Sequence, residues 1–143
     1  ELVSRFSRKP GGRFPGGWWI LVEVDIQLAG QLFRPDLAGW RRERMPNRPT
    51  GRPLELRPDW ICEIVSPSNA RMDRVEKMRA YHQAGVPHYW LVDPVEESLV
   101  VQRYSDAGFV TVLAAGRSET VRPEPFEAVE LKVGRLFGDE PEE

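Results

Sequence analysis

The stretch DWICEIVSPSNARMDRVEKMRAYHQAGVPHYWLVD, residues 59–93, decides the fold of this chain. Its first seven residues, 59–65, are mostly apolar and rich in aromatic and β-branched side chains, which predicts a strand. Successive side chains of a strand point to opposite faces, so Ile61, Glu63 and Val65 share one face. A carboxylate in the middle of an apolar strand is costly to bury unless it is paired or holds a metal. Glu63 is therefore the acid of greatest functional interest.

A helix follows this strand and leads directly into a second strand. Ser68 and Asn69 are candidate N-cap residues. The helix is expected from residue 70 or 71 to residue 84, and Gly85 is well placed to end it. Its core-facing stripe is expected to consist of Val75, Met78 and His82. The apolar segment 86–93 follows at once, so a crossover with two parallel strands is predicted.

A first hairpin is expected on the N-terminal side of this unit. Residues 18–28 alternate as one long strand, with Glu23, Asp25 and Gln27 opposite the apolar side chains. Ala29-Gly30 makes a tight turn into a second strand within residues 31–40, and Asp36 lies on this returning arm.

A second hairpin is expected on the C-terminal side, where residues 98–104 and 109–115 flank a turn. Residues 125–138 add another short strand and a hydrophobic anchor. The predicted fold class is α/β (α+β), with a mixed β-sheet flanked by helices.

Length and composition indicate one domain. The 143 residues are expected to divide into an irregular and truncated N-terminal segment (1–17), a folded domain (18–138) and an acidic tail (139–143). No apolar run approaches the roughly 20 residues of a membrane span, so no membrane partner is expected. Cys62 is the only cysteine, which rules out an internal disulfide and a multi-cysteine zinc site. A cytoplasmic location fits these features best.

The charge of the chain is unevenly distributed. Residues 1–62 carry 11 basic and 7 acidic side chains, whereas residues 63–143 carry 9 and 15. The basic excess gathers in the Pro- and Gly-rich segment 41–57. Two interpretations stay open: this segment contacts phosphates beside an acidic site, or it is a solvated arginine-rich loop.

Four residues form a candidate metal-dependent hydrolytic site: Glu23, Asp36, Glu63 and Lys77. Carboxylates from neighbouring strands can hold Mg²⁺, which activates water against a phosphodiester, and a fixed amine can stabilise the developing charge. If the strands of Asp36 and Glu63 are neighbours, their oxygens can converge on one metal. The alternatives are a turn role for Asp36 and an i, i+4 salt bridge with Asp73 for Lys77.

Three phrases carry a family resemblance: EIVSPS, the spacing D-x-x-x-K, and Y-x-x-x-G-V-x-x-Y-W-L-V-D-P. In this order they resemble the Uma-two type of restriction endonucleases, which belongs to the PD-(D/E)XK nuclease superfamily. The resemblance runs from about Trp18 to Phe137. It implies a restriction-endonuclease-like fold and Mg²⁺- or Mn²⁺-dependent cleavage of DNA.

Carried over by position, the resemblance gives Asp36 and Glu63 as catalytic metal ligands and Glu23 as an upstream acid that is a third ligand or a supporting group. The lysine that the superfamily usually has two positions after the glutamate is Val65 here, so its role is expected to pass to Lys77. A further helix and strand normally precede residue 18 in the family. The rival hypothesis is a non-catalytic domain that keeps the fold and binds nucleic acid or protein. A homodimer is an open alternative to the monomer.

Overall fold

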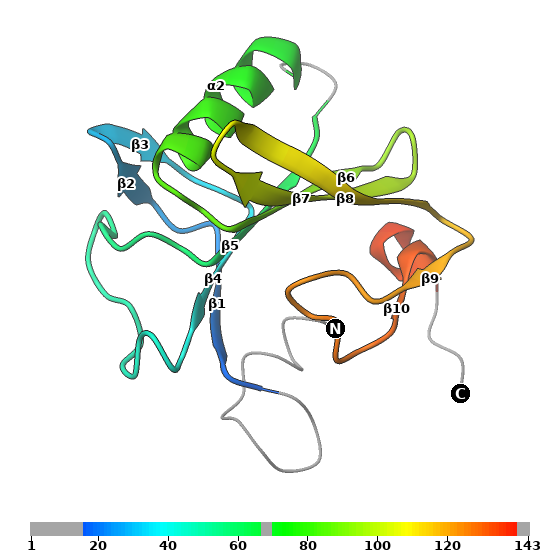
Figure 1. Ribbon diagram of the computed structural model, residues 1–143, viewed down its shortest axis with the longest axis horizontal. Coiled ribbons are helices and arrows are strands. Elements are labelled where there is room, and N and C mark those ends of the chain that lie inside the picture. Colours follow the sequence, from blue (N-terminus) through cyan, green and yellow to red (C-terminus); the bar gives the residue numbers. More distant parts are fainter. Residues whose placement is uncertain (1–15, 67–69, 140–143) are drawn as a thin grey trace.

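The computed structural model describes residues 16–66 and 70–139, which form a six-stranded mixed sheet covered on both faces (Figure 1). In spatial order its strands are β1 (Trp18–Val22), β4 (Leu37–Arg41), β5 (Trp60–Ile64), β6 (His88–Asp93), β7 (Ser98–Ser105) and β8 (Gly108–Gly116). Strands β5 and β6 run parallel, and the other neighbouring pairs are antiparallel. The predicted mixed sheet is confirmed. Residues 1–15 and 140–143 lie outside the described ranges, so the domain limits stay predictions.

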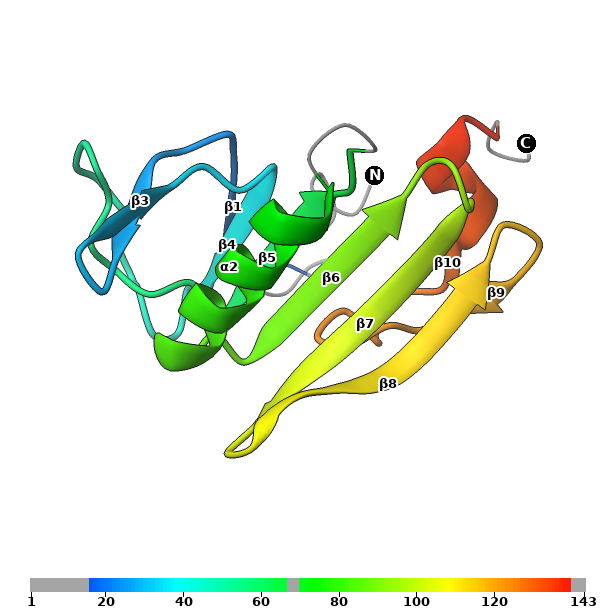
Figure 2. The same ribbon diagram turned by 90° about the horizontal axis from the view of Figure 1, so that it is seen from above.

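Helix α2 (Ala70–Gln83) makes the crossover between the two parallel strands and lies across one face of the sheet (Figure 2). Its end is a Schellman motif. Gly85 adopts a left-handed φ of 79°, its amide donates to the His82 carbonyl, and the Val86 amide donates to the Tyr81 carbonyl. The predicted stop at Gly85 is confirmed. The predicted caps Ser68 and Asn69 lie outside the described residues.

The face of α2 that packs on the sheet keeps two members of the predicted stripe, Met78 and His82, and has Tyr81 in place of Val75. Val75 is 42% exposed, whereas Tyr81 is fully buried and contacts the rings of Phe33 and Tyr89. Met78 is partly buried on the same side. The prediction of Val75 as a core residue was wrong because the large Tyr81 ring, rather than the more N-terminal valine, fills the space over β6.

The first hairpin is present, but it bends where the sequence predicted two continuous strands. Its outer part consists of β2 (Ile26–Leu28) and β3 (Gln31–Phe33), joined by the predicted Ala29-Gly30 turn, in which both residues have positive φ. One register runs through the bend, since the Glu23 amide donates to the Asp36 carbonyl between the β1–β4 and β2–β3 pairs.

The bend takes the β2–β3 arm out of the main sheet. Glu23 has a φ of 51°, and Val22 is 60% exposed instead of buried with the other apolar residues of the predicted strand. Ile26 and Leu28 are buried in the same core as Tyr81. The periodicity could not show this bend, because the arm is turned by its packing against α2 and the following loop.

The second hairpin, β7–β8, is confirmed, and the C-terminal segment covers the sheet face opposite α2 (Figure 1). This segment contains β9 (Thr120–Val121), β10 (Leu131–Lys132) and the 3₁₀ helix η1 (Val133–Phe137). Phe126 lies at its centre, edge-on to the rings of Trp18, Trp60 and Trp90 at centroid distances of 5.0, 4.9 and 5.6 Å. No helix within the described ranges is long and apolar enough to span a membrane.

Candidate active site

Strand β5 presents Glu63 to the face of the sheet that α2 covers. Alternation along the strand places Trp60 and Cys62 in the opposite core, and Ile61 in the α2-side core. Glu63 is 6% exposed. Lys77 Nζ lies 2.8 Å from its Oε2, and the Tyr81 hydroxyl donates to its Oε1 at 3.1 Å. Both oxygens of this buried carboxylate therefore have a partner on α2.

The electrostatics of this pair follow from its burial. Burial raises the pKa of the Glu63 carboxyl, and the Asp36 charge adds to this effect, although Lys77 and Tyr81 favour the ionised form. Burial also opposes the charge of Lys77, but the ion pairs with Glu63 and with Asp73 (3.1 Å) outweigh it and raise its pKa. Lys77 is thus a cation at neutral pH, and the predicted salt bridge with Asp73 coexists with the contact to Glu63.

Asp36 is brought beside Glu63 by strand pairing. Strands β4 and β5 are neighbours, and Leu37 pairs with Cys62, so the residues that follow in the register are Asp36 and Glu63. The Ile64 amide donates to Asp36 Oδ2 at 2.7 Å. The condition stated from the sequence, that the two strands be neighbours, is met.

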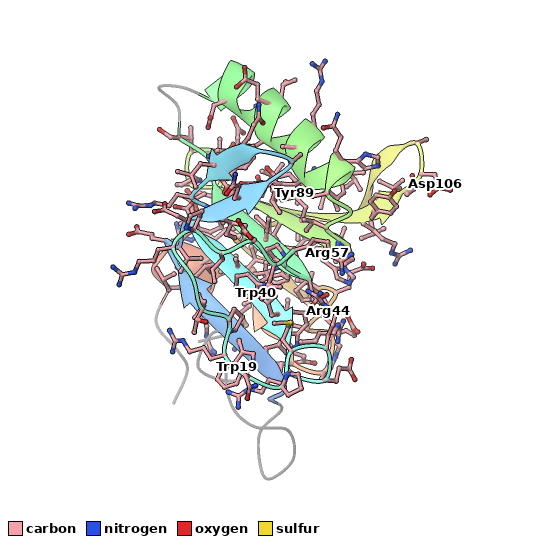
Figure 3. The ribbon with its side chains drawn as sticks, turned by 90° about the vertical axis from the view of Figure 1, so that its left-hand side faces the viewer. Trp19, Trp40, Arg44, Arg57, Tyr89 and Asp106 are labelled. Carbon is pink, nitrogen blue, oxygen red and sulfur yellow. The ribbon has the colours of Figure 1, made fainter. Side chains whose placement is uncertain are left out.

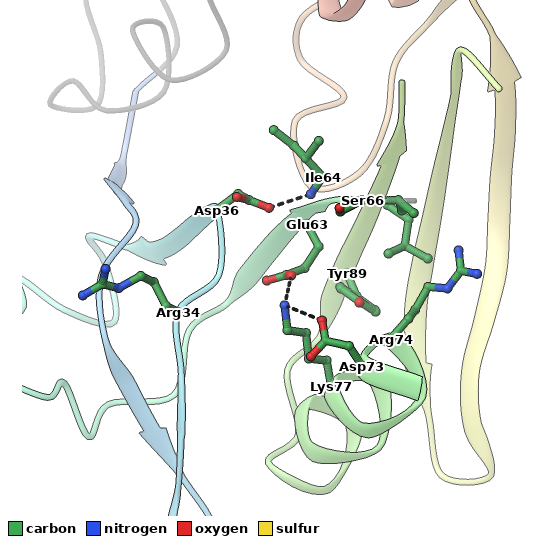
Figure 4. Close-up of a pocket in the computed structure, with 11 residues that line it drawn as sticks. Arg34, Asp36, Glu63, Ile64, Ser66, Asp73, Arg74, Lys77 and Tyr89 are labelled. Carbon is green, nitrogen blue, oxygen red and sulfur yellow. Dashed lines mark hydrogen bonds and ion pairs between the residues drawn. The ribbon is translucent and has the colours of Figure 1, made fainter. Parts of the chain in front are cut away.

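One pocket of about 190 Å³ is lined by Asp36, Glu63 and Lys77 together (Figure 4). Its lining also includes two further cations and a third acid, which are Arg34, Arg74 and Asp73. The Tyr89 hydroxyl is buried on the pocket wall and has no hydrogen-bond partner among the described residues. An arrangement of acids and cations around an opening of this size suits a charged ligand with hydrogen-bonding oxygens.

Glu23 lies apart from this pocket. Its backbone is next to Asp36, but its side chain lines a neighbouring hollow of about 560 Å³ on the other side of Arg34. Its role as a third metal ligand or supporting acid stays a prediction.

The donor chemistry of Asp36 and Glu63 fits a hard divalent cation. No group of three His, Cys, Asp or Glu side chains within residues 16–66 and 70–139 is arranged to hold a metal. Mg²⁺, however, typically keeps several waters and is held by one or two carboxylates together with substrate phosphates. Two adjacent carboxylates in an open pocket meet that requirement.

Sequence reasoning assigned no role in the site to Tyr81 or Tyr89. A signal for Tyr81 was available, since it stands four positions after Lys77 and therefore on the same helix face. Tyr89 alternates with Leu91 along β6, and both line the pocket, but this became visible only once β6 was paired with β5.

Comparisons with known proteins agree with this architecture. A family model named Uma2, described as "Putative restriction endonuclease", matches residues 3–134. Among solved structures, "a putative nuclease belonging to DUF820" from Anabaena variabilis superposes with a TM-score of 0.70 and 21% sequence identity, over 85% of this chain and 68% of that chain. No functionally curated protein matches the sequence.

At 21% identity the structural likeness establishes the fold alone, and it confirms the nuclease-like mixed sheet. The family model carries more, because it spans most of the chain and supports a nuclease function in general terms. This protein therefore belongs to the Uma2 family of restriction-endonuclease-like proteins.

Proposed function

We propose that this protein is a Mg²⁺- or Mn²⁺-dependent endonuclease that hydrolyses DNA phosphodiester bonds with a metal-activated water. The observation that carries the proposal is the convergence of Asp36, Glu63 and Lys77 on one pocket. Asp36 directly precedes β4, Glu63 lies on β5 and Lys77 lies on α2. Membership of a family described as restriction endonucleases supports the same chemistry.

Each residue has a role that its position allows. Asp36 and Glu63 would hold the metal through carboxylate oxygens. For Glu23, which lines the neighbouring hollow, we keep both proposed roles, third ligand or supporting acid, and its position favours the second. When bound, the metal would polarise a phosphoryl oxygen and lower the pKa of a water. The Lys77 ammonium, 2.8 Å from Glu63, would stabilise negative charge that develops on the phosphate. Tyr81 orients Glu63 through its hydrogen bond.

The proposal extends to the form and place of the protein. A homodimer would present two such pockets to the two strands of a duplex, and symmetric dimers are the commonest oligomers. We keep the cytoplasm as the proposed location, because the single Cys62 is buried and unpaired.

A non-catalytic domain is the second candidate, and one observation favours it. Lys77 and Tyr81 already satisfy both oxygens of Glu63, so the carboxylate has no need of a metal to be stable in the fold. A domain of this kind would bind no divalent cation.

Mn²⁺ binding measured by calorimetry separates the two candidates. We expect the wild-type protein to bind, and Asp36→Asn and Glu63→Gln to lose binding by roughly tenfold or more each. Asp106→Asn is the matched control, since this exposed acid lies at the tip of the β7–β8 hairpin, away from the pocket (Figure 3). Metal-dependent nicking of a plasmid is then assayed with the same proteins. A folded wild-type protein that neither binds Mn²⁺ nor cleaves in its presence would overturn the proposal.

A further inference from the structure

The structure divides the arginine-rich segment 41–57 into two groups. In the first group, Arg41 and Arg42 lie over the rings of Trp18 and Trp19, with centroid distances of 4.7 and 3.7 Å. Arg42 also donates from Nε to the Trp18 carbonyl. These guanidinium groups are therefore engaged with the tryptophans of β1, the edge strand of the sheet.

Arg44 and Arg57 belong to the same group and lie close together (Figure 3). Arg44 Nε is 2.9 Å from Asp59 Oδ1, and Arg57 Nη2 is 3.4 Å from the same oxygen. Arg57 Nη1 also donates to the Gly85 carbonyl at 3.1 Å. Both guanidinium groups are engaged with the one carboxylate of Asp59 and with backbone carbonyls, so they are weak candidates for contacts with a ligand.

Arg48 and Arg52 form the second group. Both are exposed, and neither makes a hydrogen bond or ion pair with a described residue. The loop that carries them is nevertheless anchored. Pro49 is buried, and Leu54 exchanges backbone hydrogen bonds of 2.9 and 2.8 Å with Asp25 and Gln27 on the β2–β3 arm. Two uncommitted cations are thus presented on a loop with fixed ends.

Both arginines line the 560 Å³ hollow beside the candidate active site. Arg34 lines this hollow and the active-site pocket, so the two openings adjoin at its side chain. Arg34 is held by Asp25, with Nε 2.8 Å from Oδ1. The hollow therefore continues the surface that leads away from Asp36, with three arginines and the acids Glu23 and Asp25 on its walls.

We infer that this hollow binds backbone phosphates of the nucleic-acid strand that enters the candidate active site, with Arg48 and Arg52 as the contacting cations. The inference rests on the proposed function, because it takes the substrate of that site to be a nucleic acid. A strand carries a phosphate for about every 3.4 Å of helix axis, so a strand with one phosphate at Asp36 must place others alongside. Thr50 and Gly51 lie between the two arginines and leave the loop without large side chains at its tip.

Fluorescence anisotropy in EDTA, over a series of salt concentrations, tests the inference without any cleavage. The probes are a labelled duplex of about 20 base pairs and the matching single strand. Arg48→Gln/Arg52→Gln is compared with the wild-type protein. Arg79→Gln is the matched control, because this exposed arginine stands two positions after Lys77 and so points about 200° away around α2.

We expect the double variant to bind roughly tenfold or more weakly at low salt, and the slope of log K against log salt to fall by about 1.8 for duplex or about 1.4 for single strand. The probe with the larger loss identifies the strand form that the hollow takes. Mn²⁺ binding and melting temperature should match the wild type in both variants, which shows that the folded site is intact.

Equal affinity and salt slope in the wild type and the double variant would overturn the inference, as would equal losses in Arg79→Gln. So would a wild-type protein that binds neither probe. Binding that depends on Arg48 and Arg52 in a protein that never cleaves would support the inference while the proposed catalytic function fails.

Discussion

Two buried acids flank the apolar residues 60–62, Asp59 directly before strand β5 and Glu63 within it, and the two acids have opposite surroundings. Asp59 is 4% exposed and accepts from the Arg41 amide at 2.8 Å as well as from Arg44 and Arg57. Glu63 is 6% exposed, is paired with one lysine and one hydroxyl, and lines a pocket together with that lysine.

The difference shows how to separate a structural acid from a functional one when burial is the same. Asp59 closes a loop onto the sheet and lines neither the active-site pocket nor the neighbouring hollow. Glu63 stands next to a second carboxylate, Asp36. The charge of Asp36 raises the free energy of the ionised form of Glu63. A fold that needed only stability would gain by keeping such acids apart, so their proximity points to a ligand.

The largest expected effect is on cleavage by Glu63→Gln. We expect a loss of roughly 1000-fold in rate, because the variant removes the charge of a proposed metal ligand. Its free energy of unfolding should change by less than about 1 kcal/mol, since Lys77 keeps Asp73 as a partner. Plasmid nicking rates and urea denaturation measure the two quantities. A variant that cleaves at the wild-type rate would remove the distinction between the two acids.

The next effect is on stability, in Asp59→Asn. We expect the free energy of unfolding to fall by about 2 kcal/mol, because two arginines lose their shared counter-charge. This expected loss is smaller than the loss on breaking a fully buried ion pair, because both arginines are partly exposed and can regain water. Cleavage per folded molecule should be retained. Urea denaturation checks the first expectation, and a rate loss in fully folded protein would contradict the second.

Two tyrosines whose rings pack against each other, Tyr81 and Tyr89, allow a smaller and sharper comparison. Tyr81→Phe removes a hydrogen bond to buried Glu63 and should lower the free energy of unfolding by about 1 kcal/mol. Tyr89→Phe removes a buried hydroxyl without a partner among the described residues, and should leave stability equal or raise it by up to about 1 kcal/mol. Thermal melts of both variants, run together, measure the sign of each change. Equal destabilisation would show that the Tyr89 hydroxyl has a stabilising contact.

The smallest effect concerns an acid paired near the surface. A hydrogen bond from Arg103 lowers the pKa of the Glu124 carboxyl, and His88 adds to this. Its folded-state pKa is therefore below the unfolded value of 4.5, so its contribution to stability is present above that pH and is lost as the pH falls through the folded pKa.

Arg103→Gln should accordingly make the fall in unfolding free energy between about pH 5 and pH 3 slightly smaller. The change is expected to be small because exposed Arg103 is screened by solvent. Urea titrations at several pH values give the slope of the unfolding free energy against pH. An unchanged slope would assign the acid sensitivity of the protein to other carboxylates.

Much of the fold could be read from local patterns. The β5–α2–β6 unit was predictable because alternation, helical spacing and the Gly85 stop are all properties of contiguous residues. The Ala29-Gly30 turn was predictable for the same reason. The bend at Glu23 was not, because it depends on where Ile26 and Leu28 find a core distant in sequence.

For the candidate site, the sequence by itself determined which residue types were available, namely Asp36, Glu63 and Lys77 at the ends or centres of regular elements. Only the tertiary structure decided their relations. The β4–β5 register set Asp36 beside Glu63, and the packing of α2 brought Lys77 and Tyr81 onto one carboxylate. The tertiary structure also decided that Arg44 and Arg57 pair with Asp59, whereas Arg48 and Arg52 stay exposed. The physical reason is that local conformation follows from neighbours in the chain, whereas pairing of charges follows from contacts between strands and loops that are remote in sequence.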